Sequence, residues 1–122
     1  MSYERLEVYR AAYQMAIEIH RLTREFPKHE IYEMGSQLRR AAVSIALNIA
    51  EGYGRKEHQQ ELKNFLLIAR GSCNETKVLL QMVRDLGYVE ESREAELEEK
   101  YDQIGKQLTS FIKAIKSPKS NV

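Results

Sequence analysis

The chain has 122 residues and a mass of 14.2 kDa, which leaves room for one domain of ordinary size. Apolar residues make up 43% and charged residues 30%, a balance that excludes general disorder and allows a buried core. The formal net charge of +1 excludes a protein that coats nucleic acid by total charge alone. A single cysteine, Cys73, excludes an internal disulfide and fits a reducing compartment. No apolar signal core or membrane-length apolar run is present, so we expect a soluble cytoplasmic protein without a membrane partner.

Alternating spacings of three and four between apolar residues predict a first helix from about Leu6 to Phe26, which Pro27 ends. Its buried seam is expected to consist of Val8, Ala12, Met15, Ile19, Leu22 and Phe26. The second helix is expected from Glu30 to Glu51, with an irregularity at Gly35–Ser36. Its seam is Leu38, Ala42, Ile45 and Ile49, and Gly52 and Gly54 supply a flexible corner after it.

The third helix is expected from Lys56 to Leu86, where Gly87 stops it. Its seam is Leu62, Phe65, Ala69, Ser72, Thr76, Leu79, Val83 and Leu86, widened by Leu66, Cys73 and Leu80. The fourth helix is expected from Ser92 to Lys116, with a seam of Leu97, Tyr101, Ile104, Leu108, Phe111 and Ile115. These one-sided seams predict an all-α, antiparallel up-and-down four-helix bundle over residues 1–116, with a disordered tail at 117–122.

The third helix carries more apolar surface than one core needs. Besides its main seam, a second face presents Leu67, Ile68, Val78 and Met82, with Gly71 between them. A helix that is apolar on two faces must be covered twice, and in a bundle of this size another subunit is the expected cover. The sequence therefore predicts a homo-oligomer whose interface includes these residues.

Several short stretches resemble a known bacterial family. They are Leu22-Thr23 with Phe26-Pro27, residues 37–45 (QLRRAAVSI), residues 48–55 (NIAEGYGR), Phe65-Leu66 with residues 68–72 (IARGS), and Leu86-Gly87-Tyr88. In this order they resemble the four-helix-bundle proteins encoded by intervening sequences in large-subunit ribosomal RNA genes. The resemblance implies a ring-shaped homopentamer. It also implies a more distant relation to the accessory protein of diversity-generating retroelements, which binds nucleic acid and a reverse transcriptase. The chain departs from the family pattern at Ala46-Leu47, where proline and a small residue are usual.

Catalytic and metal-binding patterns are missing from the sequence. The three histidines, His20, His29 and His58, are not spaced with one another or with Cys73 as metal ligands would be. The Glu-x-x-His signature of di-iron bundles is also missing. Cys73 lies on the apolar flank of the third helix, where a thiol is usually an inert core residue. We therefore expect no enzyme activity, no metal and no cofactor.

A file of cations recurs every seven residues along the third helix: Lys56, Lys63, Arg70, Lys77 and Arg84. A row of cations along a rod can follow a phosphate backbone. Alternatively, such side chains cover the core with their stems and pair with acidic neighbours, for which the acid-rich stretch 90–102 offers partners. The second interpretation is the commoner one for bundle helices.

A second basic group consists of Arg39, Arg40, Arg55 and Lys56. Its two halves lie about 20 Å apart along the bundle, so they form one patch only if a neighbouring subunit brings them together. Nucleic-acid contact and inter-subunit salt bridges are equally compatible with it. The second helix also has a polar seam, which consists of Gln37, Ser44, Asn48, Glu51 and Arg55. Ser44 and Asn48 need hydrogen-bond partners, and a network within the bundle or across a subunit boundary is favoured over a ligand site.

Two functions follow from these patterns. The first is a non-enzymatic oligomer that associates with RNA or another nucleic acid through basic edges of several subunits. The alternative is a protein–protein interaction scaffold, in which the cations are only paired or solvated and the partner is another protein.

Overall fold

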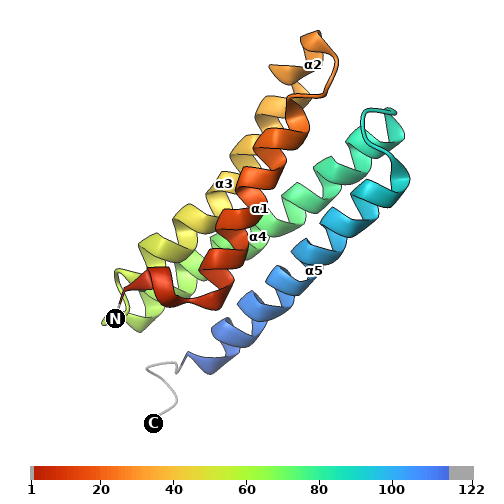
Figure 1. Ribbon diagram of the computed structural model, residues 1–122. Coiled ribbons are helices and arrows are strands. Elements are labelled where there is room, and N and C mark those ends of the chain that lie inside the picture. The colour runs from red at the N-terminus through yellow and green to blue at the C-terminus, as the bar shows by residue number, and fades with distance from the viewer. Residues whose placement is uncertain (1, 116–122) are drawn as a thin grey trace.

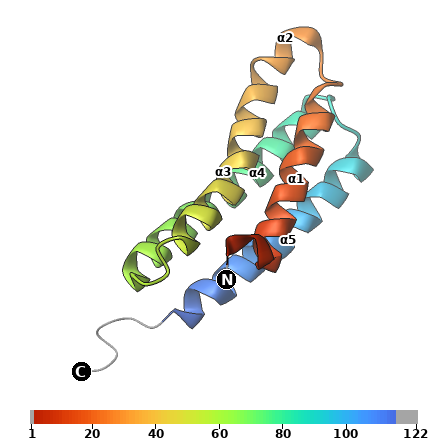
Figure 2. The same ribbon diagram turned by 60° about the vertical axis from the view of Figure 1, so that its left-hand side comes forward.

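The computed structural model describes residues 2–115, and within this range the chain is entirely helical apart from its turns and connections. A 3₁₀ turn, η1 (Tyr3–Arg5), precedes α1 (Glu7–Thr23) and the single-turn α2 (Lys28–Ile31). Three further long helices follow: α3 (Met34–Tyr53), α4 (Gln59–Asp85) and α5 (Glu91–Ala114). Figures 1 and 2 show α1, α3, α4 and α5 running alternately up and down, so that α1 begins and α5 ends at the same end of the bundle. The prediction of an all-α protein with four long helices is confirmed.

The four long helices share one core. Contacts are most extensive between α3 and α4, and α1 packs on α3 as α5 packs on α4. Residues with no exposed surface come from all four helices, among them Ile19, Leu38, Leu66 and Leu108. The seams predicted for the first two helices are buried throughout. No helix in the described part of the chain is long and apolar enough to cross a membrane.

The predicted boundaries need correction at the first connection. The helix α1 ends at Thr23 rather than at Phe26, although Phe26 is still buried against the core. The predicted second helix is divided into α2 and α3, because Glu33 has a non-helical backbone (φ −102°, ψ −93°). The break therefore comes before Gly35–Ser36, which are helical. A Cβ on Gly35 would lie 3.2 Å from the Glu30 carbonyl oxygen, so glycine permits the close approach of α2 to α3.

The other boundaries shift by only a few residues. The helix α4 begins at Gln59 instead of Lys56 and ends at Asp85. Gly87 has φ +81°, and the Tyr88 amide donates to the Val83 carbonyl at 2.9 Å, which caps the end of α4. The helix α5 ends at Ala114; the predicted end at Lys116 and the predicted tail at 117–122 lie outside the described residues.

Four residues assigned to the core seams are not fully buried. They are Phe65, Leu86, Phe111 and Ile115. Leu86 is 52% exposed, because α4 ends at Asp85 and Leu86 is its C-cap residue rather than part of the helical stripe. Phe111 is half-buried, and Ile112 is the buried residue in the last turn of α5. A spacing of four from Leu108 to Ile112 keeps the stripe on the core side of a straight helix with 3.6 residues per turn.

Candidate interaction surfaces

The cation file on α4 lies along the edge that meets α5. Lys77 Nζ is 2.7 Å from Asp102 Oδ1, and this hydrogen bond raises the pKa of Lys77 above its ordinary value. Arg70 Nη1 donates to Thr109 Oγ1 at 3.4 Å. Within the described residues Lys63 makes no ion pair. Lys56 precedes α4, and its Nζ lies over the Tyr53 ring at 4.5 Å from the centroid. These contacts support the structural interpretation for most of the file.

Arg84 is the last cation of the same file, and it pairs with a buried carboxylate. Its Nη1 is 3.1 Å from Glu94 Oε1, and its Nε is 2.9 Å from Asp85 Oδ1. Glu94 is only 2% exposed, although it belongs to the acid-rich start of α5, where a solvated side chain would be expected. Burial raises the pKa of the Glu94 carboxyl, and the neighbouring Glu98 raises it further, while Arg84 opposes the rise. The sequence offered the stretch 90–102 as a source of partners for the file, but it did not indicate that Glu94 is buried.

The second basic group is divided between structural and solvent-facing roles. The Arg39 guanidinium donates to Thr23 Oγ1 at 2.9 Å and to the Ile31 carbonyl at 3.0 Å, so it joins α1, α2 and α3. Arg40 is exposed and makes no ion pair within the described residues. Arg55 pairs with Glu51 at 3.3 Å and Glu61 at 3.1 Å, which ties the end of α3 to the start of α4.

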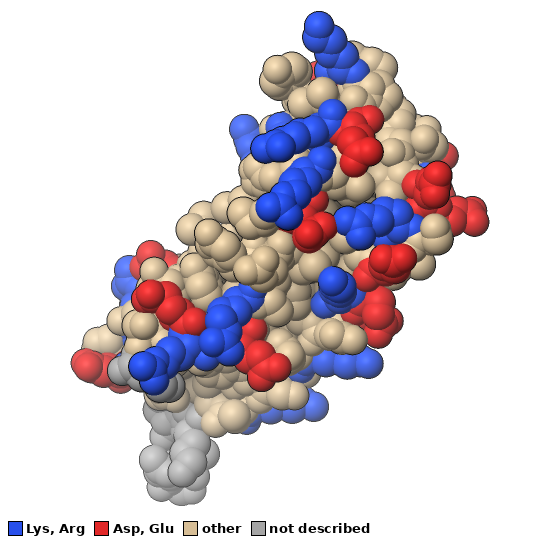
Figure 3. Space-filling view, in the orientation of Figure 1, with Lys and Arg blue, Asp and Glu red and all other residues tan. Residues whose placement is uncertain are grey.

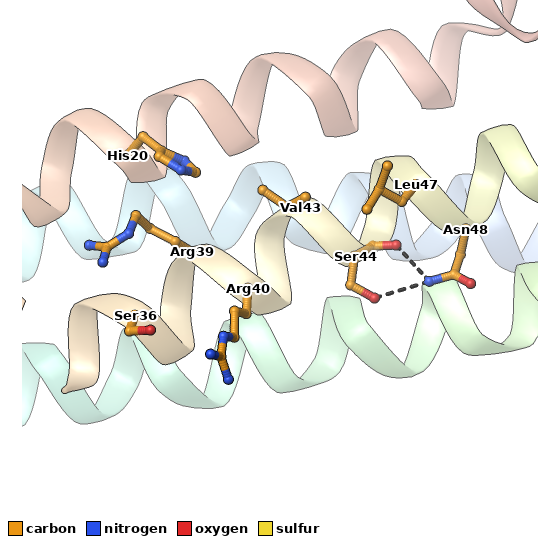
Figure 4. Close-up of a pocket in the computed structure, with 8 residues that line it drawn as sticks. All are labelled: His20, Ser36, Arg39, Arg40, Val43, Ser44, Leu47 and Asn48. Atoms are coloured by element: carbon orange, nitrogen blue, oxygen red, sulfur yellow. Dashed lines mark hydrogen bonds between the residues drawn. The ribbon is translucent and has the colours of Figure 1, made fainter. Parts of the chain in front are cut away.

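The polar seam of α3 is used inside the subunit. The Ser44 and Ser72 hydroxyl oxygens are 2.9 Å apart and link α3 to α4. Asn48 Nδ2 donates to both the carbonyl and the hydroxyl oxygen of Ser44, at 2.8 and 3.0 Å. Figure 4 shows these two bonds on α3. The hydrogen-bond partners required by Ser44 and Asn48 are thus supplied by the chain itself.

The predicted oligomer residues lie on the side of α4 that faces solvent. Leu67 is 37% exposed, Ile68 52%, Val78 54% and Met82 48%. Ile68, Val78 and Met82, but not Leu67, belong to a stripe of residues along α4 at alternating spacings of three and four. We call it the outer stripe. Its residues, all exposed, are Glu61, Asn64, Ile68, Gly71, Glu75, Val78, Met82 and Asp85.

A groove between α1 and α3 is a surface that sequence reasoning missed. Its apolar middle encloses about 250 Å³ and is lined chiefly by Tyr9, Tyr13, Ile17, Val43 and Leu47. Toward α2 it opens into a hollow of about 440 Å³, which shares His20, Val43 and Leu47 and adds Arg39 and Arg40 (Figure 4). We call the two together the α1–α3 groove. The i, i+4, i+8 spacing of Tyr9, Tyr13 and Ile17 is the sequence signal that could have found it.

Charges of both signs are interspersed on the face shown in Figure 3. Lysine and arginine side chains alternate there with acidic ones, and the middle of the α1 and α3 side carries no charged residue. Tyr13 and Ile17 on α1 and Leu47 on α3 are exposed apolar side chains. This face therefore presents no single positive field for a phosphate backbone.

Groups with catalytic potential are buried or isolated. Cys73 is 1% exposed, its thiol donates to the Tyr101 carbonyl at 3.2 Å, and burial raises its pKa to about 11. A thiol with that pKa is a poor nucleophile at neutral pH. His20 Nδ1 lies 3.0 Å from the Ala16 carbonyl oxygen on its own helix. In the described range no three His, Cys, Asp or Glu side chains are grouped so that they could hold a metal ion.

Comparison with known proteins identifies a family profile and a similar solved structure, each covering most of the chain. Residues 4–110 match the profile of the 23S rRNA-intervening sequence protein family. The fold is similar to that of a crystal structure from Bacteroides thetaiotaomicron, a protein of unknown function from the S23 ribosomal protein family. The TM-score is 0.78 at 25% identity, covering 88% of this chain and 99% of that one. A search of curated proteins gave no match. The chain belongs to the 23S rRNA-intervening sequence protein family.

Proposed function

We propose that this protein is a non-enzymatic, self-associating helical scaffold whose subunits join through the outer stripe of α4. The observation that carries the proposal is the exposure of Ile68, Val78 and Met82, each about half exposed on one side of a helix whose opposite side fills the core. Covering apolar surface stabilises an assembly by about 25 cal/mol for each Å² removed from water. The ring-shaped assembly implied by the family resemblance is consistent with such an interface.

The mass of the assembly tests this proposal. Changing Ile68 or Met82 to glutamate places a charge in the proposed interface and leaves the monomer core untouched. We expect each variant to keep its helical circular dichroism and to have the monomer mass by light scattering, whereas the parent has a larger mass. A Glu substitution at Asn64, on the same stripe but beyond its apolar part, is the control. Parent-like masses for both Ile68→Glu and Met82→Glu would contradict the proposal.

A second candidate function is association of the assembled oligomer with nucleic acid. The family description, which ties these proteins to 23S rRNA genes, favours it. Of the eight cations considered from the sequence, Arg40 and Lys63 make no ion pair within the described residues. Intramolecular partners are held by Arg39, Arg55, Arg70, Lys77 and Arg84, and Lys56 lies over the Tyr53 ring. Arg40 and Lys63 are therefore the residues to test first.

Retention of a structured RNA at several salt concentrations distinguishes the two functions. Removing a phosphate contact weakens binding and flattens its salt dependence together. For a nucleic-acid protein we expect both effects in an Arg40→Ala, Lys63→Ala double variant, with Glu99→Ala as a control of opposite charge. Equal retention and equal salt slopes in the parent and the double variant would count against nucleic-acid binding and favour the scaffold function.

A further inference from the structure

The outer stripe of α4 and the α1–α3 groove are two apolar surfaces of different shape on one chain. The stripe is the convex side of a helix, and the groove is a hollow between two helices. Tyr13, Ile17 and Leu47 in or beside the groove are 49%, 36% and 63% exposed. If either surface stays uncovered, its large apolar side chains are exposed to water.

The groove is long enough to receive the apolar part of the stripe. That part, from Ile68 to Met82, spans fifteen residues, or about 21 Å of helix. The α3 side of the groove, together with a neighbouring hollow lined by Leu47, Ala50 and Gly54, runs from Ser36 to Arg55. This is about 28 Å of helix, longer than the apolar part of the stripe. A helix laid along the groove therefore contacts it over the whole apolar length of the stripe.

Gly71 lies within the stripe and serves no contact inside the subunit. A Cβ at this position would have no atom within 4 Å, so the bundle itself does not require glycine. Glycine in a helix interior is less favourable than alanine. A flat place on the stripe permits another backbone or a bulky side chain, such as a groove tyrosine, to approach α4 closely.

The charges of the two surfaces are complementary. The stripe contains three acidic residues and neither lysine nor arginine. Two of them, Glu61 and Asp85, pair with arginines of the same chain, and Glu75 does not. The groove is bordered at the end near α2 by Arg39, whose guanidinium is engaged within the chain, and by Arg40. Glu75 is exposed and makes no ion pair within the described residues, as is also true of Arg40. Opposite charges across a contact favour it and fix its register.

The same charges disfavour a contact between two stripes. Glu75 is the midpoint of the segment from Ile68 to Met82, so a two-fold pairing centred on the apolar stripe places the two Glu75 carboxylates together at the axis. Like charges brought together in an interface oppose association. A two-fold contact also buries the same surface on both partners and leaves both grooves uncovered.

We infer that the partner of the outer stripe is the α1–α3 groove of a second copy of this chain, so that subunits join head to tail. This inference rests on the proposed self-association and names the surface that receives the stripe. Each copy in such an assembly offers one stripe and one groove, and a contact between unlike surfaces generates a closed ring or an open filament.

Mixing two variants of the full chain tests the inference. The stripe variant, Ile68→Glu, keeps an intact groove, and the groove variant, Leu47→Glu, keeps an intact stripe. Both residues are more than half exposed, so both variants are expected to fold as the parent does. We expect each variant alone to have the monomer mass by light scattering. An equimolar mixture should contain a 1:1 heterodimer, because one groove and one stripe remain able to bind and the other two surfaces are blocked.

A cross-linking measurement keeps the test decisive if the heterodimer is weak. In the otherwise unchanged chain, Val78→Cys labels the stripe and Leu47→Cys labels the groove, while the native Cys73 is buried. With a short bis-maleimide, we expect the double variant to give a ladder of linked subunits. Each single variant should give no linked dimer.

Each other result has a distinct meaning. If Leu47→Glu keeps the parent mass while Ile68→Glu is monomeric, the groove is not the partner, and the proposed scaffold function survives. If Ile68→Glu and Met82→Glu both keep the parent mass, the proposed function and the inference both fail. Linked dimers from Val78→Cys alone would establish a stripe-to-stripe contact and overturn the head-to-tail arrangement. Two monomeric variants that neither combine nor cross-link would also overturn it.

Discussion

Arg39 and Arg40 are adjacent in the sequence, and each has a different environment. Successive residues on a helix are about 100° apart, so Arg39 turns toward α1 and α2 while Arg40 faces solvent beside the groove. The Arg39 guanidinium satisfies the Ile31 carbonyl at the end of α2 and the Thr23 hydroxyl at the end of α1. One arginine therefore holds the first connection in place, and its neighbour is free for an intermolecular contact.

We expect Arg39→Ala to lower the free energy of unfolding by about 1–3 kcal/mol, because two hydrogen-bond acceptors lose a charged donor. Arg40→Ala should change it by less than about 0.5 kcal/mol, as is usual for an exposed side chain. The comparison is to be made in urea with the Ile68→Glu background, so that assembly does not contribute. Equal effects of the two substitutions would show that the Arg39 contacts do not stabilise the fold.

Glu94 predicts a pH dependence of stability. Its pKa in the folded chain lies above the ordinary value of 4.5, so the folded protein holds this proton at a pH where the unfolded chain has released it. The contribution is fully present below pH 4.5 and is lost as the pH rises through the folded pKa. Glu94→Gln should remove this slope. The free energy of unfolding of the variant minus that of the parent should therefore increase from pH 4.5 to pH 7.

Glu96→Gln provides the control for the Glu94 prediction. Its carboxylate is 69% exposed in the same turn of α5, and its nearest cation, Arg93, lies 3.8 Å away. The difference in free energy of unfolding between Glu96→Gln and the parent should be the same at every pH. A pH-independent difference between Glu94→Gln and the parent would mean that the buried carboxyl keeps an ordinary pKa.

At the scale of the helices, the contact between α3 and α4 depends on a glycine in an ordinary helical conformation. Gly52 was expected to supply a flexible corner, yet α3 continues through it and Gly87 has the only positive φ among the described residues. A Cβ at position 52 would lie 2.8 Å from Phe65 Cβ and 3.3 Å from the Leu62 carbonyl oxygen. Close packing of two helices, rather than backbone freedom, is the reason for this glycine.

Gly52→Ala should therefore destabilise the protein by about 1–3 kcal/mol, the usual cost of overfilling a packed contact. Gly54→Ala is the matched control, since its Cβ would meet only ordinary contacts at 3.5 Å and its φ is −63°. This control should be neutral or stabilise by up to about 1 kcal/mol, because alanine restricts the unfolded chain. Thermal unfolding of both variants measures the difference. A neutral Gly52→Ala would mean that α3 and α4 can separate at this point without cost.

For the whole molecule, self-association links stability to protein concentration. If subunits bind through the outer stripe, the folded state is stabilised by mass action, and Tm falls on dilution. We expect a hundred-fold dilution of the parent to lower Tm by on the order of 5 °C. The Ile68→Glu variant should show no concentration dependence. A parent Tm that stays constant over this range would argue against the assembly.

Much of the fold could be predicted because it depends on local patterns. A period of 3.6 residues identifies which residues of α1, α3, α4 and α5 face the core, and Gly87 identifies a helix end from its backbone alone. The same reasoning failed at Glu33 and Phe111, where the backbone break and the buried position depend on how neighbouring helices pack. The second apolar face of α4 was also visible in the sequence, because it is a property of one helix.

The sequence by itself determined the helical class, the number of long helices and the outer stripe of α4. Only the tertiary structure decided which cations have partners within the chain, because the partners of Arg39, Lys77 and Arg84 come from other helices. It also decided the burial of Glu94 and the shape of the α1–α3 groove, whose walls come from two different helices. Helix period and helix ends are set by short-range steric and hydrogen-bonding rules, whereas burial, ion pairs and grooves arise from contacts between residues far apart in the chain.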